Sequence, residues 1–517
     1  MLVVIVCFWI LRGEAHTGRR IIDFLYVNER MEDHSLVYTL DEKLGAVRFG
    51  TFQCLVLVYA GLGWFAEAME IMILSFVGPV VKSEWGLSLN EESLITTVVF
   101  AGVMIGSYSW GLLSDNYGRR KGFLFASLIT SVAGLLSAFS PSYRTLVALR
   151  FLVGIGLGGG SVFLSWFLEF VPAHNRGMWT VVFTTFWTFG TIFEASLAWI
   201  VMPRLNWRWL LALSSVPSFA LLLFYGFVPE SPRYLCMKGQ IADANQILET
   251  IAVVNKVELP PGKLVFYGNV IEDEESVPLE GSPLLSSTRK RIMKCNSFFS
   301  SFFMLFSRKL IWTTLLLWIL FFGSTFTYYG IILLTSELSI EQSKCRSIIL
   351  HEGKSQDNSI YIDAFITSLA ELPGLLLSAV LVDRVGRKIS MAIMFVLAFV
   401  FLLPLLLHQS SVVTTGLLFG ARMCAIGSFT VACIYAPEIY PTSVRATGAG
   451  VASSFGRIGG MVCPLVAISL ISGCEEMTAI IVFEIVIAIT VVCIFFFPFD
   501  TMGKELIDDV DISNSSN

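Results

Sequence analysis

Twelve apolar runs, each long enough to cross a lipid bilayer, constrain this chain more than any other feature of its sequence. A spanning helix needs about 20 mostly apolar residues. Inside a bilayer every backbone N–H and C=O needs a partner within the protein, so runs of this length must be helical. The sequence therefore predicts an all-α membrane protein with twelve transmembrane helices in two six-helix bundles. The predicted spans lie near 52–81, 94–113, 122–140, 146–171, 178–201, 209–228, 310–336, 360–382, 389–407, 412–436, 447–471 and 477–497.

The composition supports a membrane protein and excludes several other classes. Hydrophobic residues make up 55% of the chain and charged residues only 15%, against about 25% charged in soluble domains. With a net charge of -5 and no basic stripe, a nucleic-acid partner is not expected. The sequence contains no metal-ligand spacing, cofactor loop or nucleophile–base pair, so we expect neither a metal, nor a cofactor, nor an enzyme. The expected partners are the bilayer, a small organic ion and protons, and the expected state is a monomer.

The polar stretches divide the chain into five expected parts. Residues 1–30 are expected to be an upstream extension of the gene model, because Met31 opens a polar lead-in. Apolar residues at helical spacing over 241–251 predict a short amphipathic helix, and the stretch after Pro261 is expected to be disordered. The parts are a lead-in (1–50), an N-terminal bundle (51–228), a cytosolic linker (229–309), a C-terminal bundle (310–497) and a cytosolic tail (498–517).

Basic residues indicate the orientation, since Lys and Arg gather on the cytosolic side of membrane proteins. The clusters at 119–121 and 384–388 and the basic residues of 229–309 all fall on one side if the N-terminus is inside. We therefore expect both termini in the cytosol.

Two motifs each occur twice along the chain. DNYGRRK recurs as DRVGRK 268 residues later, and EFVPAHNR recurs as EIYPTSVR 269 residues later. Two motifs that share one spacing indicate that each half is a copy of one six-helix unit, as in transporters that work by rocking two repeats. The repeated residues are Asp115, Gly118, Arg119 and Arg120 with Asp383, Gly386 and Arg387, and Glu169 and Arg176 with Glu438 and Arg445.

The residue types in each repeated motif predict its physical role. Glycine permits a tight turn at the membrane edge, and the aspartate can meet a cation or a helix N-terminus. The Glu–Arg motifs bracket a proline at the inner ends of the fourth and tenth spans, where charge pairs between the bundles could lock an inner gate. The alternative is that these charges only anchor the topology.

These motifs, together with PESPRYL and APEIYPTSVRATG, resemble the signature set of the major facilitator superfamily, in its sugar-porter and organic-ion-porter branches. GWFAEAMEIMILSFVGP, FWTFGTIFEASLAW and RIGGMVCPLVA resemble more closely the plant organic cation/carnitine transporter 7 group, which is related to synaptic vesicle protein-two-related proteins and bacterial nicotinate transporters. The resemblance implies a twelve-helix fold and transport of a small organic ion.

Ionisable residues within the spans are functional candidates, because each costs about 2.5 to 3.5 kcal/mol at mid-bilayer. Glu67 and Glu70 share one helix face, and ionising two carboxylates this close is costly, which suits a proton carrier. For all of these charges, and for Arg422 and Glu484, the alternative is an interhelical ion pair that only holds the bundle together. The candidates for substrate or proton binding are Glu67, Glu70, Arg150, Glu194, Glu371 and Arg457.

Aromatic and small residues carry two further predictions. Trp187, Tyr328 and Tyr329 could form a wall for a flat ring or a quaternary ammonium, although core packing is the alternative for each. Gly102 with Gly106, and the glycine run from Gly154, predict close helix contacts rather than a nucleotide loop.

Two short features suggest processing and location. Cys345 and Cys474 fall in two outer loops, so we expect a disulfide between them. Glu280, Leu284 and Leu285 form an acidic dileucine sequence that would sort the protein to an endomembrane. We expect a multi-pass protein of the vacuolar or plasma membrane.

The sequence thus predicts a proton-coupled secondary transporter that moves a small organic ion by rocking two bundles. Within the resemblance we favour nicotinate or N-methylnicotinate, followed by carnitine-like cations. A carboxylate substrate would need Arg457 or Arg150, whereas a cation would need Glu67, Glu70 or Glu371. The alternatives are a sugar-porter-like transporter of a neutral solute and a ligand-binding relative that does not transport.

Overall fold

All twelve predicted spans are helical in the computed structural model. The structure describes residues 37–172, 176–264, 303–308, 310–350, 358–407, 409–440, 444–471 and 476–501. The spans are formed in chain order by α4 with α5, α6, α7, α8 with α9, α10, α11 with α12 and η3, α17, α18 with α19, α20 with η5, α21, α22 and α23. Their bounds are α4 Thr51–Met72, α5 Leu74–Trp85, α6 Leu89–Tyr117, α7 Arg119–Ala138, α8 Tyr143–Leu157, α9 Gly160–Leu168, α10 Arg176–Val201, α11 Trp207–Ser214, α12 Val216–Phe224, η3 Tyr225–Phe227, α17 Ile311–Leu350, α18 Asn358–Leu369, α19 Glu371–Val385, α20 Arg387–Leu402, η5 Leu403–Leu406, α21 Ser411–Ile439, α22 Arg445–Ile471 and α23 Glu476–Phe495.

Several helices extend beyond the predicted apolar runs because polar caps lengthen them. The second span was predicted from residue 94, but α6 begins at Leu89. Ser88 accepts from the backbone N–H of Glu91, and the Glu91 carboxylate accepts from the backbone of Ser88, which is a capping box. Such a box satisfies N–H groups that have no partner within the helix. Hydropathy alone does not detect this polar first turn.

The chain divides into two compact units. The small unit contains the described residues of 1–59, 166–176 and 229–278. In it α14 (Ile241–Asn255), which is the predicted amphipathic helix, packs through Ala244, Leu248 and Ile251 against α3 (Leu40–Val47) and α13 (Pro232–Met237). Strands β1 (Val37–Tyr38) and β2 (Lys263–Leu264) pair in parallel beside them. The lead-in therefore pairs and packs with part of the linker.

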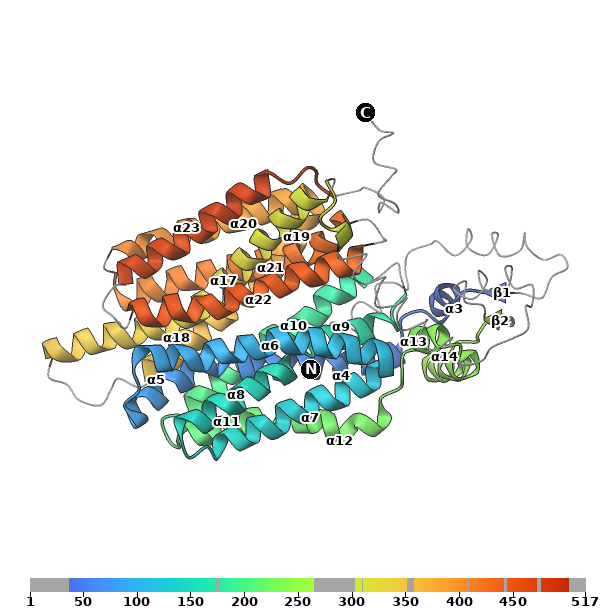
Figure 1. Ribbon diagram of the computed structural model, residues 1–517, viewed down its shortest axis with the longest axis horizontal. Coiled ribbons are helices and arrows are strands. Elements are labelled where there is room, and N and C mark those ends of the chain that lie inside the picture. The colour runs from blue at the N-terminus through green and yellow to red at the C-terminus, as the bar shows by residue number, and fades with distance from the viewer. Residues whose placement is uncertain are drawn as a thin grey trace. The chain divides into compact units, whose positions relative to one another are not determined.

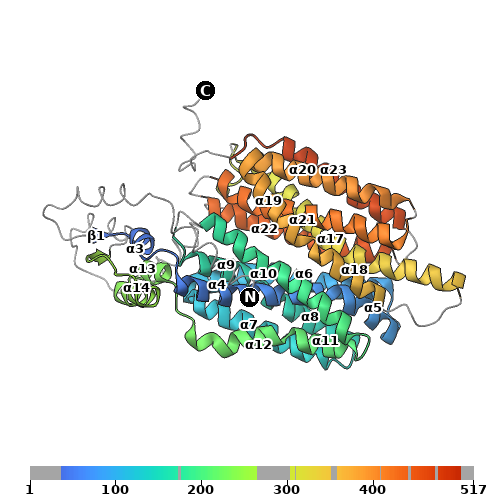
Figure 2. The ribbon, with the colours of Figure 1, turned by 180° about the vertical axis from the view of Figure 1, so that it is seen from behind.

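The large unit contains 60–165, 177–228 and 279–517 and holds nearly all of the membrane helices. We call α4–α12 the N half, and α17–α23 the C half. Helices of each half lie together in both ribbon views (Figures 1 and 2). We call the end of this unit that carries Gly118 and Gly386 the motif end, and the other the opposite end.

The two halves meet through α6 and α22. Near the start of α6, at the opposite end, the hydroxyls of Ser93 and Ser469 lie 3.2 Å apart and the hydroxyl of Thr97 donates to the carbonyl of Met461 at 3.3 Å. The ring centroids of Phe76 and Tyr361 lie 5.8 Å apart. Polar and aromatic contacts therefore join the halves at the opposite end.

Glycines allow α6 and α8 to cross closely, as the sequence predicted. A Cβ atom at Gly154 would lie 2.2 Å from the carbonyl oxygen of Val99, and one at Gly106 would lie 2.1 Å from that of Ile155. These distances are shorter than any van der Waals contact. The two backbones can approach this closely only because the side chains are missing.

Alanine at Gly154 should therefore destabilise the fold. We expect Gly154→Ala to cost about 1–3 kcal/mol, the usual range for overpacking, and to lower the melting temperature of the detergent-purified protein. Gly111→Ala is the matched control, because a Cβ at that position has nothing within 4 Å. Equal melting temperatures for the two variants would contradict the close crossing.

Candidate functional site

The centre of the C half holds a completely buried ion pair. Glu371 is the first residue of α19, which restarts after Leu369 because Pro373 has no N–H to donate back to that carbonyl. Arg422 of α21 donates to Glu371 Oε1 from Nε at 3.0 Å and from Nη2 at 2.7 Å. Both side chains are 0% exposed. Because a buried charge is stable only when it is paired, the two form one neutral unit.

Helix α10 of the N half reaches this ion pair. Thr191 donates from Oγ1 to Glu371 Oε2 at 3.3 Å, and Tyr328 of α17 donates from its hydroxyl to Glu371 Oε1 at 2.7 Å. The indole N–H of Trp187, one turn before Thr191, donates to the Tyr328 hydroxyl at 2.7 Å. The predicted residues Trp187, Tyr328 and Glu371 are thus brought together. Their hydrogen bonds link the two halves.

A second group of residues lies around Glu67 of α4. Glu67 is 7% exposed and interacts electrostatically with Arg457 of α22, which in turn hydrogen-bonds to Tyr329 of α17. Trp64 lies one turn before Glu67, with its ring centroid 5.3 Å from that of Trp187. Within the described part of the chain, Glu67 Oε1 and Trp64 Nε1 are buried without a hydrogen-bond partner. Buried polar atoms are rarely left unpaired, so this group has the character of a binding site.

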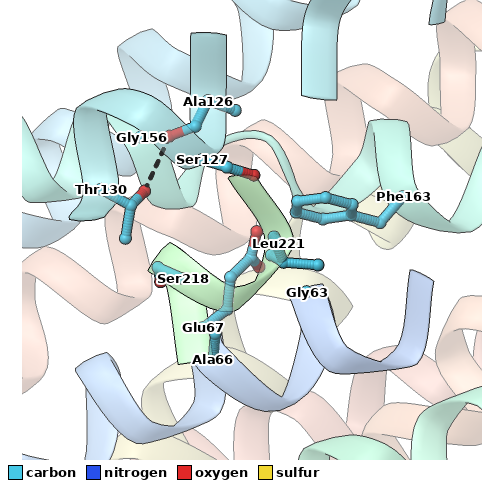
Figure 3. Close-up of a pocket in the computed structure, with 10 residues that line it drawn as sticks. All are labelled: Gly63, Ala66, Glu67, Ala126, Ser127, Thr130, Gly156, Phe163, Ser218 and Leu221. Atoms are coloured by element: carbon cyan, nitrogen blue, oxygen red, sulfur yellow. Dashed lines mark hydrogen bonds between the residues drawn. The ribbon is translucent and has the colours of Figure 1, made fainter. Parts of the chain in front are cut away.

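A small pocket adjoins Glu67 within the N half. Figure 3 shows the Glu67 side chain pointing from α4 toward Ser127 and Leu221, with Ser218 on one side and the ring of Phe163 on the other. The volume open to a water-sized molecule is about 10 Å³, which is close to the space that one water needs. Ser127 Oγ is also buried without a partner among the described residues. The pocket is lined by Gly63, Ala66, Glu67, Ala126, Ser127, Thr130, Gly156, Phe163, Ser218 and Leu221.

The N half contains its own buried ion pair. Arg150 of α8 donates from Nη1 to Glu70 Oε2 at 2.9 Å and from Nε to Ser137 Oγ at 3.2 Å. Glu194 of α10 is 0% exposed and lies close enough to Glu70 for the two carboxyl groups to interact. The hydroxyl of Ser214, on α11, lies 2.9 and 2.8 Å from the two carboxyl oxygens of Glu194. Glu67 and Glu70, although they share a helix face, therefore have different partners.

The repeated glycine turns have the predicted backbone. Gly118 has φ 106° and Gly386 has φ 89°, values that glycine adopts without a steric penalty. In the first copy Asp115 pairs with Arg119, as expected for an aspartate meeting a cation. Arg120 lies over the ring of Tyr225, 4.8 Å from its centroid.

The second turn uses residues that the motif does not contain. Asp500, beyond the last span, accepts from the backbone N–H groups of Arg387 and Lys388 at 3.1 and 2.9 Å. Arg387 also donates from Nε to Glu438 Oε2 at 3.0 Å. This pair joins α20 to α21 within the C half, whereas we expected Glu438 to form charge pairs between the bundles. The conformation described here therefore has that charge engaged within its own half.

In the small unit, the first Glu–Arg motif has an unexpected partner. Arg176 donates from Nη2 to Asp41 Oδ1 at 3.2 Å, and Arg233 of the linker also pairs with Asp41. Asp41 lies in the first turn of α3, so a carboxylate of the lead-in engages the Arg176 of the motif. Glu169 lies close enough to Arg176 to interact electrostatically.

Several predicted features lie outside the described residues. They are the side chains of Cys345 and Arg445, the residue Cys474, the sorting sequence at 280–285, and residues 1–30. The predicted disulfide and the sorting signal therefore remain predictions.

Comparison with known proteins identifies the family. The sequence profile described as "Sugar (and other) transporter" matches residues 82–509. The chain belongs to this family of the major facilitator superfamily. The transporter is 54% identical over 493 residues to organic cation/carnitine transporter 7 of Arabidopsis thaliana, a match that covers 93% of this chain and 98% of the relative. It is 36% identical to the synaptic vesicle 2-related protein of Bos taurus, covering 91% of this chain and 82% of the relative.

Solved structures agree with the fold. The inward open conformation of a xylose transporter from E. coli superposes with a TM-score of 0.62 at 16% identity, covering 88% of this transporter and 98% of that chain. A D-xylose–proton symporter gives a TM-score of 0.63 at 17% identity, covering 89% and 100%. At these identities the likeness concerns the fold alone. The transporter is thus an integral multi-pass membrane protein, as its composition predicted.

Sequence reasoning missed four residues of the site. Trp64 was one of many tryptophans in an apolar run, and Thr191 and Ser214 are small hydroxyl residues that such runs commonly contain. Asp500 lies outside both motif copies. The only available signal for Thr191 was its position one turn after Trp187 on the same helix face.

Proposed function

We propose that the transporter moves a small organic ion that combines a positively charged nitrogen with a carboxylate, as N-methylnicotinate and carnitine do. The observation that carries this proposal is the Glu67 group. It contains an acidic side chain and Arg457, which suit the two ends of such an ion, and Trp64, one turn before Glu67, packs its ring against that of Trp187. Aromatic faces attract desolvated cations by about 2 kcal/mol. Nicotinate itself would use mainly Arg457.

The Glu67 group differs from the two buried ion pairs in its hydrogen bonding. Glu371 and Glu70 are engaged by Arg422 and Arg150, whereas Glu67 Oε1 has no hydrogen-bond partner among the described residues. A substrate cation can therefore approach Glu67 without breaking an existing ion pair. The printed name of the relative at 54% identity, an organic cation/carnitine transporter, supports the same class of substrate.

We propose proton-coupled alternating access as the mechanism. The halves contact each other at the opposite end, while the Arg387–Glu438 pair at the motif end stays within the C half. This arrangement supports a conformation that opens toward the motif end. The basic clusters support placing the motif end and both termini in the cytosol. The protein acts as a monomer in the vacuolar or plasma membrane.

A neutral sugar is the main alternative substrate, since the matching profile and the solved structures include sugar transporters. A neutral solute has no need of paired charges of opposite sign in an aromatic site. The uptake test should therefore use labelled N-methylnicotinate, nicotinate, carnitine and xylose with the full chain in proteoliposomes. We expect saturable uptake of at least one organic ion and none of xylose. Uptake of xylose alone would overturn the proposal, and ligand binding without counterflow would favour a non-transporting relative.

A further inference from the structure

The carboxyl groups of Glu67, Glu70 and Glu371 each interact with an arginine. The carboxyl group of Glu194 interacts with no arginine among the described residues. Glu371 pairs with Arg422 and Glu70 pairs with Arg150, and Glu67 interacts with Arg457. Among the residues that the structure describes, the groups that act on Glu194 are the hydroxyl of Ser214 and the carboxyl of Glu70. An ionised carboxylate with no cation, beside a second carboxylate and fully buried, would be strongly unfavourable.

The hydrogen bonds at Ser214 point to the same state. The Ser214 hydroxyl has a single proton, but three oxygens lie around it: the two of Glu194, at 2.9 and 2.8 Å, and the backbone carbonyl of Leu210, at 2.8 Å. If Glu194 is a neutral acid, its own O–H donates to Ser214 Oγ, and Ser214 donates to Leu210. Both hydroxyl protons then have an acceptor, as expected for buried donors.

The position of Glu194 links it to the rest of the site. It lies one turn after Thr191 on α10, and Thr191 donates to Glu371 in the C half. The charged groups around this part of α10 are Glu70 with Arg150 on the N-half side and Glu371 with Arg422 on the C-half side. A movement of α10 would therefore change the surroundings of Glu194 and of the C-half ion pair together.

We propose that Glu194 is the site that carries the coupled proton, with Glu70 and Arg150 remaining a neutral ion pair beside it. The step is one proton binding to the Glu194 carboxylate from water on one side of the membrane and leaving to water on the other. No other bond changes. Loss of the proton leaves a buried Glu194 carboxylate beside the Glu70–Arg150 pair without a cation of its own, so the empty state is unfavourable until a proton or a rearrangement relieves it. This inference rests on the proton coupling proposed above and assigns the coupled proton to Glu194.

Infrared spectroscopy of the purified transporter tests the protonation state independently of transport. A protonated carboxylic acid has a carbonyl stretching band that a carboxylate lacks. We expect one such band at neutral pH to be missing in Glu194→Gln, whose amide can still hydrogen-bond to Ser214. Glu371→Gln is the control, since it removes an ionised carboxylate and should leave the acid bands in place. An unchanged acid region in Glu194→Gln would overturn the inference.

Transport in proteoliposomes tests the coupling role. With N-methylnicotinate or carnitine as the probe, Glu194→Gln should still exchange substrate across the membrane, but its accumulation under an imposed pH gradient should fall to a ratio of about one. Accumulation equal to that of the unmodified protein would overturn the role of Glu194. If the unmodified protein itself shows no pH-driven accumulation, the proposed proton coupling fails, and with it the coupling role, while the infrared result still decides whether Glu194 holds a proton.

Discussion

Arg422→Leu should abolish transport and destabilise the protein. The substitution leaves Glu371 fully buried without its cation, and removing one partner of a buried ion pair costs about 3–5 kcal/mol. Arg422 also holds the Glu371 carboxylate in place. Without it, the carboxylate can no longer accept the hydrogen bonds from Tyr328 and Thr191 that link the two halves. Thermal unfolding in detergent and substrate uptake in proteoliposomes measure the two effects.

A double substitution separates charge from packing at this position. Glu371→Gln with Arg422→Gln removes both charges, so it should recover much of the melting temperature that Arg422→Leu loses. Arg422→Lys should rescue only partly, because lysine cannot reproduce two donors from one planar group. A melting temperature for Arg422→Leu equal to that of the unmodified protein would show that the ion pair is not needed for the fold.

Glu67→Gln should weaken cation binding with a much smaller effect on folding. Among the described residues no cation is hydrogen-bonded to Glu67, so the substitution removes the attraction to the substrate nitrogen and the electrostatic interaction with Arg457 but breaks no hydrogen-bonded ion pair. A loss of about 2 kcal/mol of charge–charge attraction corresponds to a roughly thirtyfold rise in KM for carnitine. The measurement is the concentration dependence of uptake. Transport of nicotinate, which has no such nitrogen charge, should change less.

Glu484→Gln is the matched control for Glu67→Gln. Glu484 is also buried, at 6% exposed, and both of its carboxyl oxygens have no hydrogen-bond partner within the described part of the chain. It lies on α23, a helix that contributes no residue to the contacts described above for Glu67, Glu70 or Glu371, so the KM of Glu484→Gln for carnitine should equal that of the unmodified protein. A similar rise in both variants, or in neither, would remove Glu67 from the binding site.

The sequence predicts the membrane helices well because each one depends on a local property. A run of about 20 apolar residues can satisfy its backbone only as a helix, whatever lies next to it. The ends are less predictable, since the first turn of α6 depends on the capping box at Ser88 and Glu91 rather than on hydropathy. The breaks before Pro373 and Pro404 follow from the missing N–H of proline.

The site was predictable residue by residue but not as an arrangement. Buried charges such as Glu371 and Arg422 are conspicuous in apolar runs, because each is costly unless it has a partner. Which partner each one takes depends on the neighbouring helices and their rotation, and no local pattern contains that information. This is why the pairing of Glu438 with Arg387, and the contribution of Asp500 to the second turn, required the structure.

The central claim is that the transporter accumulates an organic ion at the expense of a proton gradient. The measurement that tests it most directly is the ratio of internal to external labelled N-methylnicotinate and carnitine in proteoliposomes at steady state, under an imposed gradient of one pH unit. If one proton moves with each substrate, that gradient supplies about 1.4 kcal/mol and supports up to about tenfold accumulation. The account predicts accumulation above the external concentration that collapses when a protonophore is added. Equal concentrations on both sides, with or without the gradient, would contradict it.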